Sequence, residues 1–246
     1  MTGRVTYNLG IPGIGPREYL ELARRFAPIF HPKIVVLNIY EGNDLRDLVR
    51  EQKFLLRGID SSNKIASPWH VSYALEFLIA NVKLSIKAVK GLTAEHDFHY
   101  KAPINGKMME MNTSNRDQDE VDTAIDLSSG KVSLELFLDP LKNFVSWAQA
   151  TGIKPVVLYT PSMYTAYDKT VIFSDPKVGS VLRAQSEAQR AWLAAHAADI
   201  GFTYYDLTSD FQTATAAGEL THFPGNVHLT SHGHAVVARA LAAILQ

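Results

Sequence analysis

The chain has 246 residues, of which 46% are hydrophobic and 20% charged, and its 24 Lys and Arg nearly balance its 25 Asp and Glu. This is the composition of a globular protein with a sizeable core, and the balanced charge argues against a nucleic acid or an acidic membrane surface as a partner. The absence of cysteine excludes disulfides, thiolate metal ligands and a cysteine nucleophile.

The sequence contains no segment that we expect to span a membrane. The most apolar stretch, at about residues 71–80, includes Glu76 and is too short to cross a bilayer. The first residues read as a β-like run, not as the apolar core of a signal peptide. The compartment is therefore open: a periplasmic or secreted location requires a signal upstream of this sequence, and otherwise the protein is cytoplasmic.

The first forty residues predict one βαβ unit. Residues 4–8 favour a strand, and residues 10–15, with three glycines and a proline, favour a turn. An apolar helical stripe follows up to about Phe30, and Pro32 ends it. Residues 34–40 are almost continuously apolar, as in a parallel strand buried on both faces.

The middle of the chain is less regular. Residues 69–92 predict a helix, whereas residues 93–130 are polar with little periodicity. We expect an insertion or cap at about residues 45–130 that covers a site, or alternatively a solvated, mobile loop.

Regular alternation returns in the second half. Residues 134–148 and 178–200 predict long amphipathic helices, residues 156–159 and 202–205 predict strands, and residues 236–245 predict the last helix. We therefore expect residues 1–246 to form a single domain with a three-layer α/β/α architecture around a mostly parallel sheet.

Three stretches fall where ligands bind in such folds, beyond the carboxyl ends of the strands. They are the glycine turn at residues 10–15, the Glu41-Gly42-Asn43-Asp44 stretch, and the loop that holds His228.

These stretches carry a family resemblance. Residues 8–13 (Asn-Leu-Gly-Ile-Pro-Gly) resemble the second sequence block of SGNH (GDSL-type) hydrolases. Residues 42–44 (Gly-Asn-Asp) resemble the third block, and residues 227–230 (Val-His-Leu-Thr) with Gly233 and His234 resemble the last. The resemblance implies a flavodoxin-like fold and hydrolysis of an acyl ester on a carbohydrate, lipid or small molecule through an acyl-serine intermediate, without a cofactor. It implies that Gly13 and Asn43 are oxyanion-hole donors and that His228 is the general base.

The family's first block departs most from this sequence. No Gly-Asp-Ser occurs, so the expected nucleophile and the central strand before it are missing. Ser129 and Ser162 lie in turn contexts and are not assigned as nucleophiles. We expect a gene product truncated by a misplaced start in preference to a relic without acyl-enzyme chemistry, and an inactive or impaired enzyme as the chain stands.

The partner of the histidine also departs from the family, which places an aspartate two or three residues earlier. Asn226 occupies one of these positions. An asparagine oxygen can orient the imidazole but adds no anion to stabilise an imidazolium, so we expect weaker catalysis.

Other readings remain open. Asn43 and Asp44 are common turn residues, and His228 could be a hydrogen-bonded loop histidine. A non-catalytic relative that binds a carbohydrate or acts as a scaffold would keep the same cleft. A metal-dependent hydrolase would use the histidine cluster, but the metalloprotease spacing is absent and we predict no metal; the cluster comprises His222, His228, His232 and His234.

Overall fold

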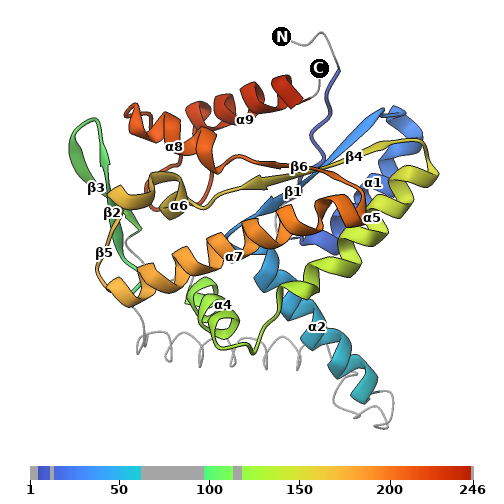
Figure 1. Cartoon of the computed structure of the whole chain (residues 1–246), viewed down its shortest axis with the longest axis horizontal. Coiled ribbons are helices and arrows are strands. Elements are labelled where there is room, and N and C mark those ends of the chain that lie inside the picture. The colour runs from blue at the N-terminus through green and yellow to red at the C-terminus, as the bar shows by residue number, and fades with distance from the viewer. Residues whose placement is uncertain (1–4, 12–13, 62–96, 113–117, 245–246) are drawn as a thin grey trace, which may run out of the picture.

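The computed structural model describes residues 5–11, 14–61, 97–112 and 118–244 (Figure 1). The helices are α1 (Pro16–Phe30), α2 (Asp44–Ser61), α4 (Gln118–Ser128), α5 (Leu138–Ala150), α6 (Met163–Tyr167), α7 (Pro176–Ile200), α8 (Thr208–Ala216) and α9 (Ser231–Ile244), with short 3₁₀ helices η2 (Leu134–Phe137) and η3 (Asp168–Thr170). The strands are β1 (Ile34–Tyr40), β2 (Tyr100–Ile104), β3 (Lys107–Asn112), β4 (Lys154–Thr160), β5 (Ile172–Phe173) and β6 (Thr203–Asp206).

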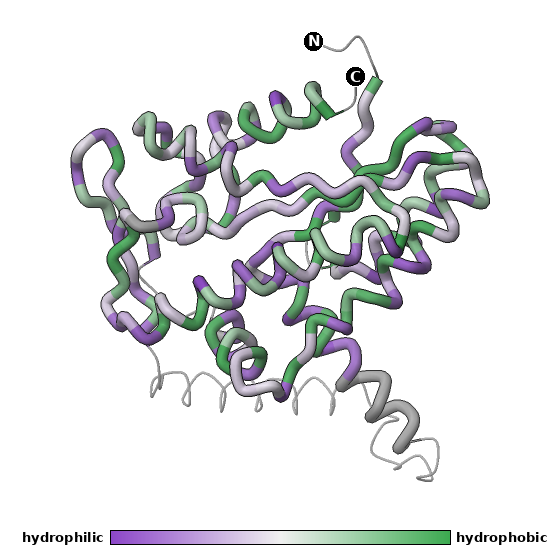
Figure 2. Tube along the Cα trace, in the orientation of Figure 1, coloured by the Kyte–Doolittle hydropathy of each residue, from purple (hydrophilic) through white to green (hydrophobic). Residues whose placement is uncertain are grey.

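The central sheet is parallel, with strand order β1-β4-β6. β4 lies in the middle and is buried along its length after Lys154, as its apolar sequence predicts. Apolar stretches of the chain are green in Figure 2, and the strands of this sheet contribute several of them.

Helices cover both faces of this sheet, so the predicted α/β/α layering is confirmed for the parallel sheet. Val157 and Tyr159 of β4 face a core that includes Leu20 of α1, Phe144 of α5 and Leu193 of α7. The alternate side chain, Leu158, belongs to a second core with side chains from α8 and α9, which lie on the opposite side of the sheet in Figure 1.

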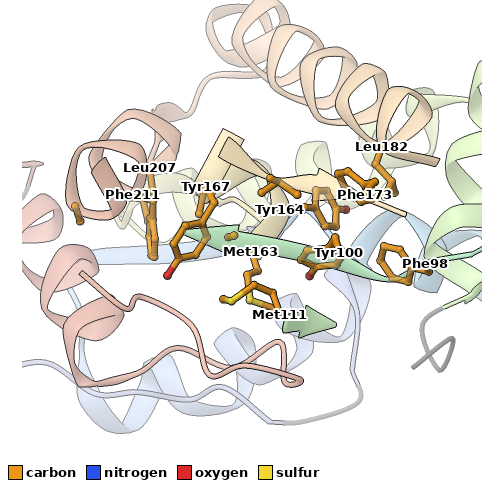
Figure 3. Close-up of a cluster of buried hydrophobic side chains, with 14 of the residues drawn as sticks. Phe98, Tyr100, Met111, Met163, Tyr164, Tyr167, Phe173, Leu182, Leu207 and Phe211 are labelled. Atoms are coloured by element: carbon orange, nitrogen blue, oxygen red, sulfur yellow. The ribbon is translucent and has the colours of Figure 1, made fainter. Parts of the chain in front are cut away.

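A second, antiparallel sheet of order β3-β2-β5 lies beside the first, and the sequence did not predict it. Asn105 and Gly106, both with positive φ, form the turn between β2 and β3. The aromatic cluster in Figure 3 joins this sheet to α6, with Tyr100 packed edge-on to Tyr164. The alternative of a solvated, mobile loop is therefore wrong for residues 100–112 and for α4.

The strand predicted at residues 4–8 is also wrong in its described part, because residues 5–8 form no strand. Val5 and Tyr7 are 78% and 54% exposed. Within the described part of the chain β1 pairs only with β4, so no described strand occupies its other edge, and Asn38 is exposed.

The other predicted helices and strands that fall within the described residues are confirmed, with bounds shifted by a few residues. The predicted helix at residues 69–92 lies outside the described residues. None of the described helices is long and apolar enough to cross a membrane.

Candidate functional site at the carboxyl edge of the parallel sheet

The register of the strands determines which residues meet at the edge. Tyr40 pairs with Thr160, and Tyr159 pairs with Asp206. The backbone hydrogen bonds continue past the strand ends. The Glu41 N–H donates to the Thr160 carbonyl (3.1 Å), and the Leu207 N–H donates to the Tyr159 carbonyl (3.0 Å). The segments after β1, β4 and β6 therefore begin side by side.

Asn43 stands at this edge, immediately before α2. Its carbonyl accepts the Asp47 N–H (2.8 Å) and its side-chain Nδ2 donates to Asp47 Oδ2 (2.7 Å). The side chain is half-buried. An amide nitrogen carries two hydrogens, so a second donor remains beyond the bond to Asp47.

Asp44 is buried and is held by two donors. The Tyr40 backbone N–H donates to Oδ2 (2.9 Å) and the Tyr19 hydroxyl donates to Oδ1 (3.0 Å). Burial raises the pKa of Asp44 to about 7, against the lowering effect of these hydrogen bonds. Asp44 thus fixes the turn between β1 and α2, and α1 contributes to that turn through Tyr19.

Gly42 leaves room at this turn for side chains of β1 and α4. A Cβ at this position would lie 2.6 Å from Tyr40 Cε1 and 2.8 Å from Glu120 Oε1. These distances are shorter than ordinary Cβ contacts, so a larger residue here would force the Tyr40 and Glu120 side chains to move.

Glu41 lies at the same edge and was not predicted from the sequence as a site residue. Its carboxylate is fully buried and accepts hydrogen bonds from β4–α6 and from α7. The available signal was its position, because a carboxylate directly after a buried parallel strand has to find donors or a cation.

His228 lies on a hairpin that spans residues 221–230. His222 forms a β-bridge with Leu229, the Phe223 N–H donates to the His228 carbonyl (3.0 Å), and the Thr230 N–H donates to the Thr221 carbonyl (3.0 Å). This pairing turns His222 inward, where it is buried, and leaves His228 exposed.

The tip of the hairpin is fixed to the second sheet. Gly225 has a φ of 70° and donates its N–H to the Met111 carbonyl of β3 (2.6 Å). Asn226 Oδ1 accepts the backbone N–H of His228 (2.9 Å). The asparagine therefore shapes the turn that presents the histidine, and its action on the imidazole ring stays a prediction.

His222 is the other histidine at this edge. Burial lowers its pKa to about 4, with a smaller opposing effect from the Pro161 carbonyl, so the ring is neutral at pH 7. Its Nδ1 lies 3.0 Å from Thr221 Oγ1. No three His, Asp or Glu side chains of the described residues are grouped as a metal site.

The described contacts do not join the predicted catalytic residues to one another. Asn43 and the hairpin of His228 both lie beyond the sheet, but no hydrogen bond joins Asn43 to His228 among the described contacts. Gly13 lies outside the described residues. Ser162 is buried, with its N–H donating to Glu41, and Ser129 bonds to the Asp126 carbonyl, as turn serines do.

No family model matches the sequence, and neither a curated protein nor a solved structure matches it.

Proposed function

We propose that this chain carries the base and the oxyanion donors of an acyl-ester hydrolase of SGNH type, in a flavodoxin-like fold. The observation that carries the proposal is the place of Asn43, a neutral amide between the end of β1 and the start of α2, at the edge of the sheet where ligands bind in such folds. Its second N–H can donate to a developing oxyanion without adding charge. Gly13 is the second donor in this proposal.

His228 is the general base of the proposed reaction. Its side chain is exposed on a hairpin that is fixed by backbone bonds at both ends, so the ring is accessible to a substrate while its main chain is held. The substrate is an acyl ester of a small molecule or a carbohydrate. No Gly-Asp-Ser serine occurs in these 246 residues, so the reaction that we propose for the chain is attack by a water molecule that His228 activates.

Hydrolysis of p-nitrophenyl acetate by the purified chain tests the proposal. We expect His228→Ala to reduce the rate to the buffer background and Asn43→Ala to reduce it roughly tenfold, less than the hundredfold or more seen for one oxyanion donor in a complete active site. His234→Ala is the matched control, because His234 is also exposed and should leave the rate unchanged. Equal rates for the His228 and His234 variants would contradict the proposal.

Asn226→Asp separates an orienting role from an electrostatic one. Aspartate keeps the oxygen that accepts the His228 N–H and adds an anion that stabilises an imidazolium. We expect the variant to hydrolyse p-nitrophenyl acetate several-fold faster, with the same far-ultraviolet circular dichroism as the parent chain. An unchanged rate would remove Asn226 from the proposed mechanism.

A non-catalytic binding or scaffold protein is the second candidate. The observation that favours it is that neither serine offers an accessible, activated hydroxyl: Ser129 Oγ donates to the Asp126 carbonyl, and Ser162 is buried. Calorimetric binding of an acetylated oligosaccharide without any turnover would support this function over the first.

A further inference from the structure

The carboxylate of Glu41 joins three elements of the fold. The Ser162 N–H, after β4, donates to Oε2 (3.2 Å), the Thr165 hydroxyl of α6 donates to Oε1 (2.6 Å), and the Ser186 hydroxyl of α7 donates to Oε2 (3.1 Å). The main chain of Glu41 adds a contact to the same helix, because Gln189 Nε2 donates to its carbonyl (3.4 Å). One side chain at the end of β1 thus holds α6 and α7 in place.

The groups that face this carboxylate are hydroxyls and amides. Tyr40 of β1, Tyr159 of β4 and Tyr164 of α6 all lie close enough to sense its charge, and Glu120 of α4 faces Tyr40. Among the described residues, no Lys, Arg or His forms an ion pair with Glu41. Burial outweighs the hydrogen bonds and raises the pKa of Glu41 to about 7, so its protonation state changes near neutral pH.

We propose that Glu41 is a proton-controlled latch at the carboxyl edge of the sheet. The neutral carboxyl keeps its acceptor oxygens for Ser162 and Thr165 and can donate its own hydrogen to a neighbouring hydroxyl, so the junction of β1, α6 and α7 stays closed and dry. The ionised carboxylate is a buried charge without a cation, and water has to enter the junction to solvate it.

The latch acts on both sides of the candidate site. Asn43 follows Glu41 by two residues, and Ser162 begins the segment that leads into α6. Loosening the junction above neutral pH therefore changes the mobility of both segments. The latch is a property of the fold at this edge and does not depend on whether the edge hydrolyses esters.

Nuclear magnetic resonance of the whole chain, labelled with ¹⁵N-serine and ¹⁵N-threonine, tests the latch between about pH 5.5 and about pH 8.5. We expect the Ser162 amide shift to titrate with a midpoint near neutral pH. We also expect the protection of the Ser162 and Thr165 amides against hydrogen exchange to fall about tenfold above it, after correction for intrinsic base catalysis. Glu41→Gln should abolish both changes, whereas Asp44→Asn, which removes the other titrating carboxyl of the turn, should keep them.

A Ser162 titration that persists in Glu41→Gln, or one that is absent from the parent chain, would overturn the latch. If Glu41→Gln does not fold, ¹³C labelling of the glutamate carboxyls in the parent chain reports the same titration directly. A buried Glu41 carboxyl that is still ionised at about pH 5 would then refute the proposal.

Discussion

Replacing Gly233 with alanine is expected to destabilise the chain by roughly 3 kcal/mol or more, a large part of the stability of a typical domain. Gly233 is in the first turn of α9, and a Cβ there would lie 2.2 Å from the Thr221 carbonyl oxygen and 3.1 Å from Leu229 Cβ. The obstacle is backbone, and the Thr221 carbonyl already accepts the Thr230 N–H that closes the hairpin. A methyl group therefore breaks this bond or displaces α9.

Urea unfolding of the variant provides the measurement, with Gly225→Ala as the control. Gly225 has a φ of 70°, a conformation that favours glycine, but a Cβ there would meet no other atom. Backbone strain alone should therefore destabilise the control variant by about 1 kcal/mol. If the two variants lose equal free energy of unfolding, the hairpin and α9 move apart easily around the new methyl group, and the predicted crowding at Gly233 is wrong.

The second large effect is a stability that decreases as pH rises. The pKa values of Glu41 and Asp44 rise on folding from 4.5 and 3.8 to about 7, chiefly through burial. The folded chain therefore binds more protons than the unfolded chain between these values. The contribution of these two carboxyls to the stability of the fold is greatest below about pH 4 and is lost as the pH rises to about 7.

His222 acts in the opposite direction. Its pKa falls on folding from 6.5 to about 4, so its contribution is lost as pH falls through that range. Between about pH 5 and about pH 8 the two carboxyls outweigh the histidine, because one unit of pKa corresponds to about 1.4 kcal/mol. We expect a net loss on the order of 3 kcal/mol across this range.

Urea unfolding free energies at about pH 5 and about pH 8 measure this loss directly. The double variant Glu41→Gln and Asp44→Asn removes the dominant groups and leaves His222, so the slope should reverse and stability should rise with pH between about 5 and 6.5. A double variant with the slope of the parent chain would show that other groups govern the dependence.

The sequence predicts those elements whose residues bury an apolar face. Apolar runs located β1 and β4, and amphipathic periodicity located α1, α5 and α7, because burial in both sheet faces follows directly from these patterns. Residues 5–8 have strand propensity but form no strand, since a strand also needs a neighbour to bond with.

The second sheet could have been found from its turn. Asn105-Gly106 is the commonest two-residue hairpin signal, but the polar composition around it, with Pro103 in the first strand, favoured a loop. The sequence motifs place the candidate site at Asn43 and His228, and this assignment stays a prediction. Glu41 was missed because its partners Thr165 and Ser186 are more than a hundred residues away in the sequence.

The edge of β1 that no described strand occupies affects how the chain associates with itself in concentrated solution. A seven-residue strand of mostly apolar sequence, with backbone donors and acceptors along one side that no described strand takes up, is a template on which further strands assemble. Natural edge strands are protected by lysines, prolines or bulges, and β1 has none of these. Concentrated solutions of the chain are therefore expected to precipitate or form extended sheets through this strand, and its colloidal behaviour depends on what covers those seven residues.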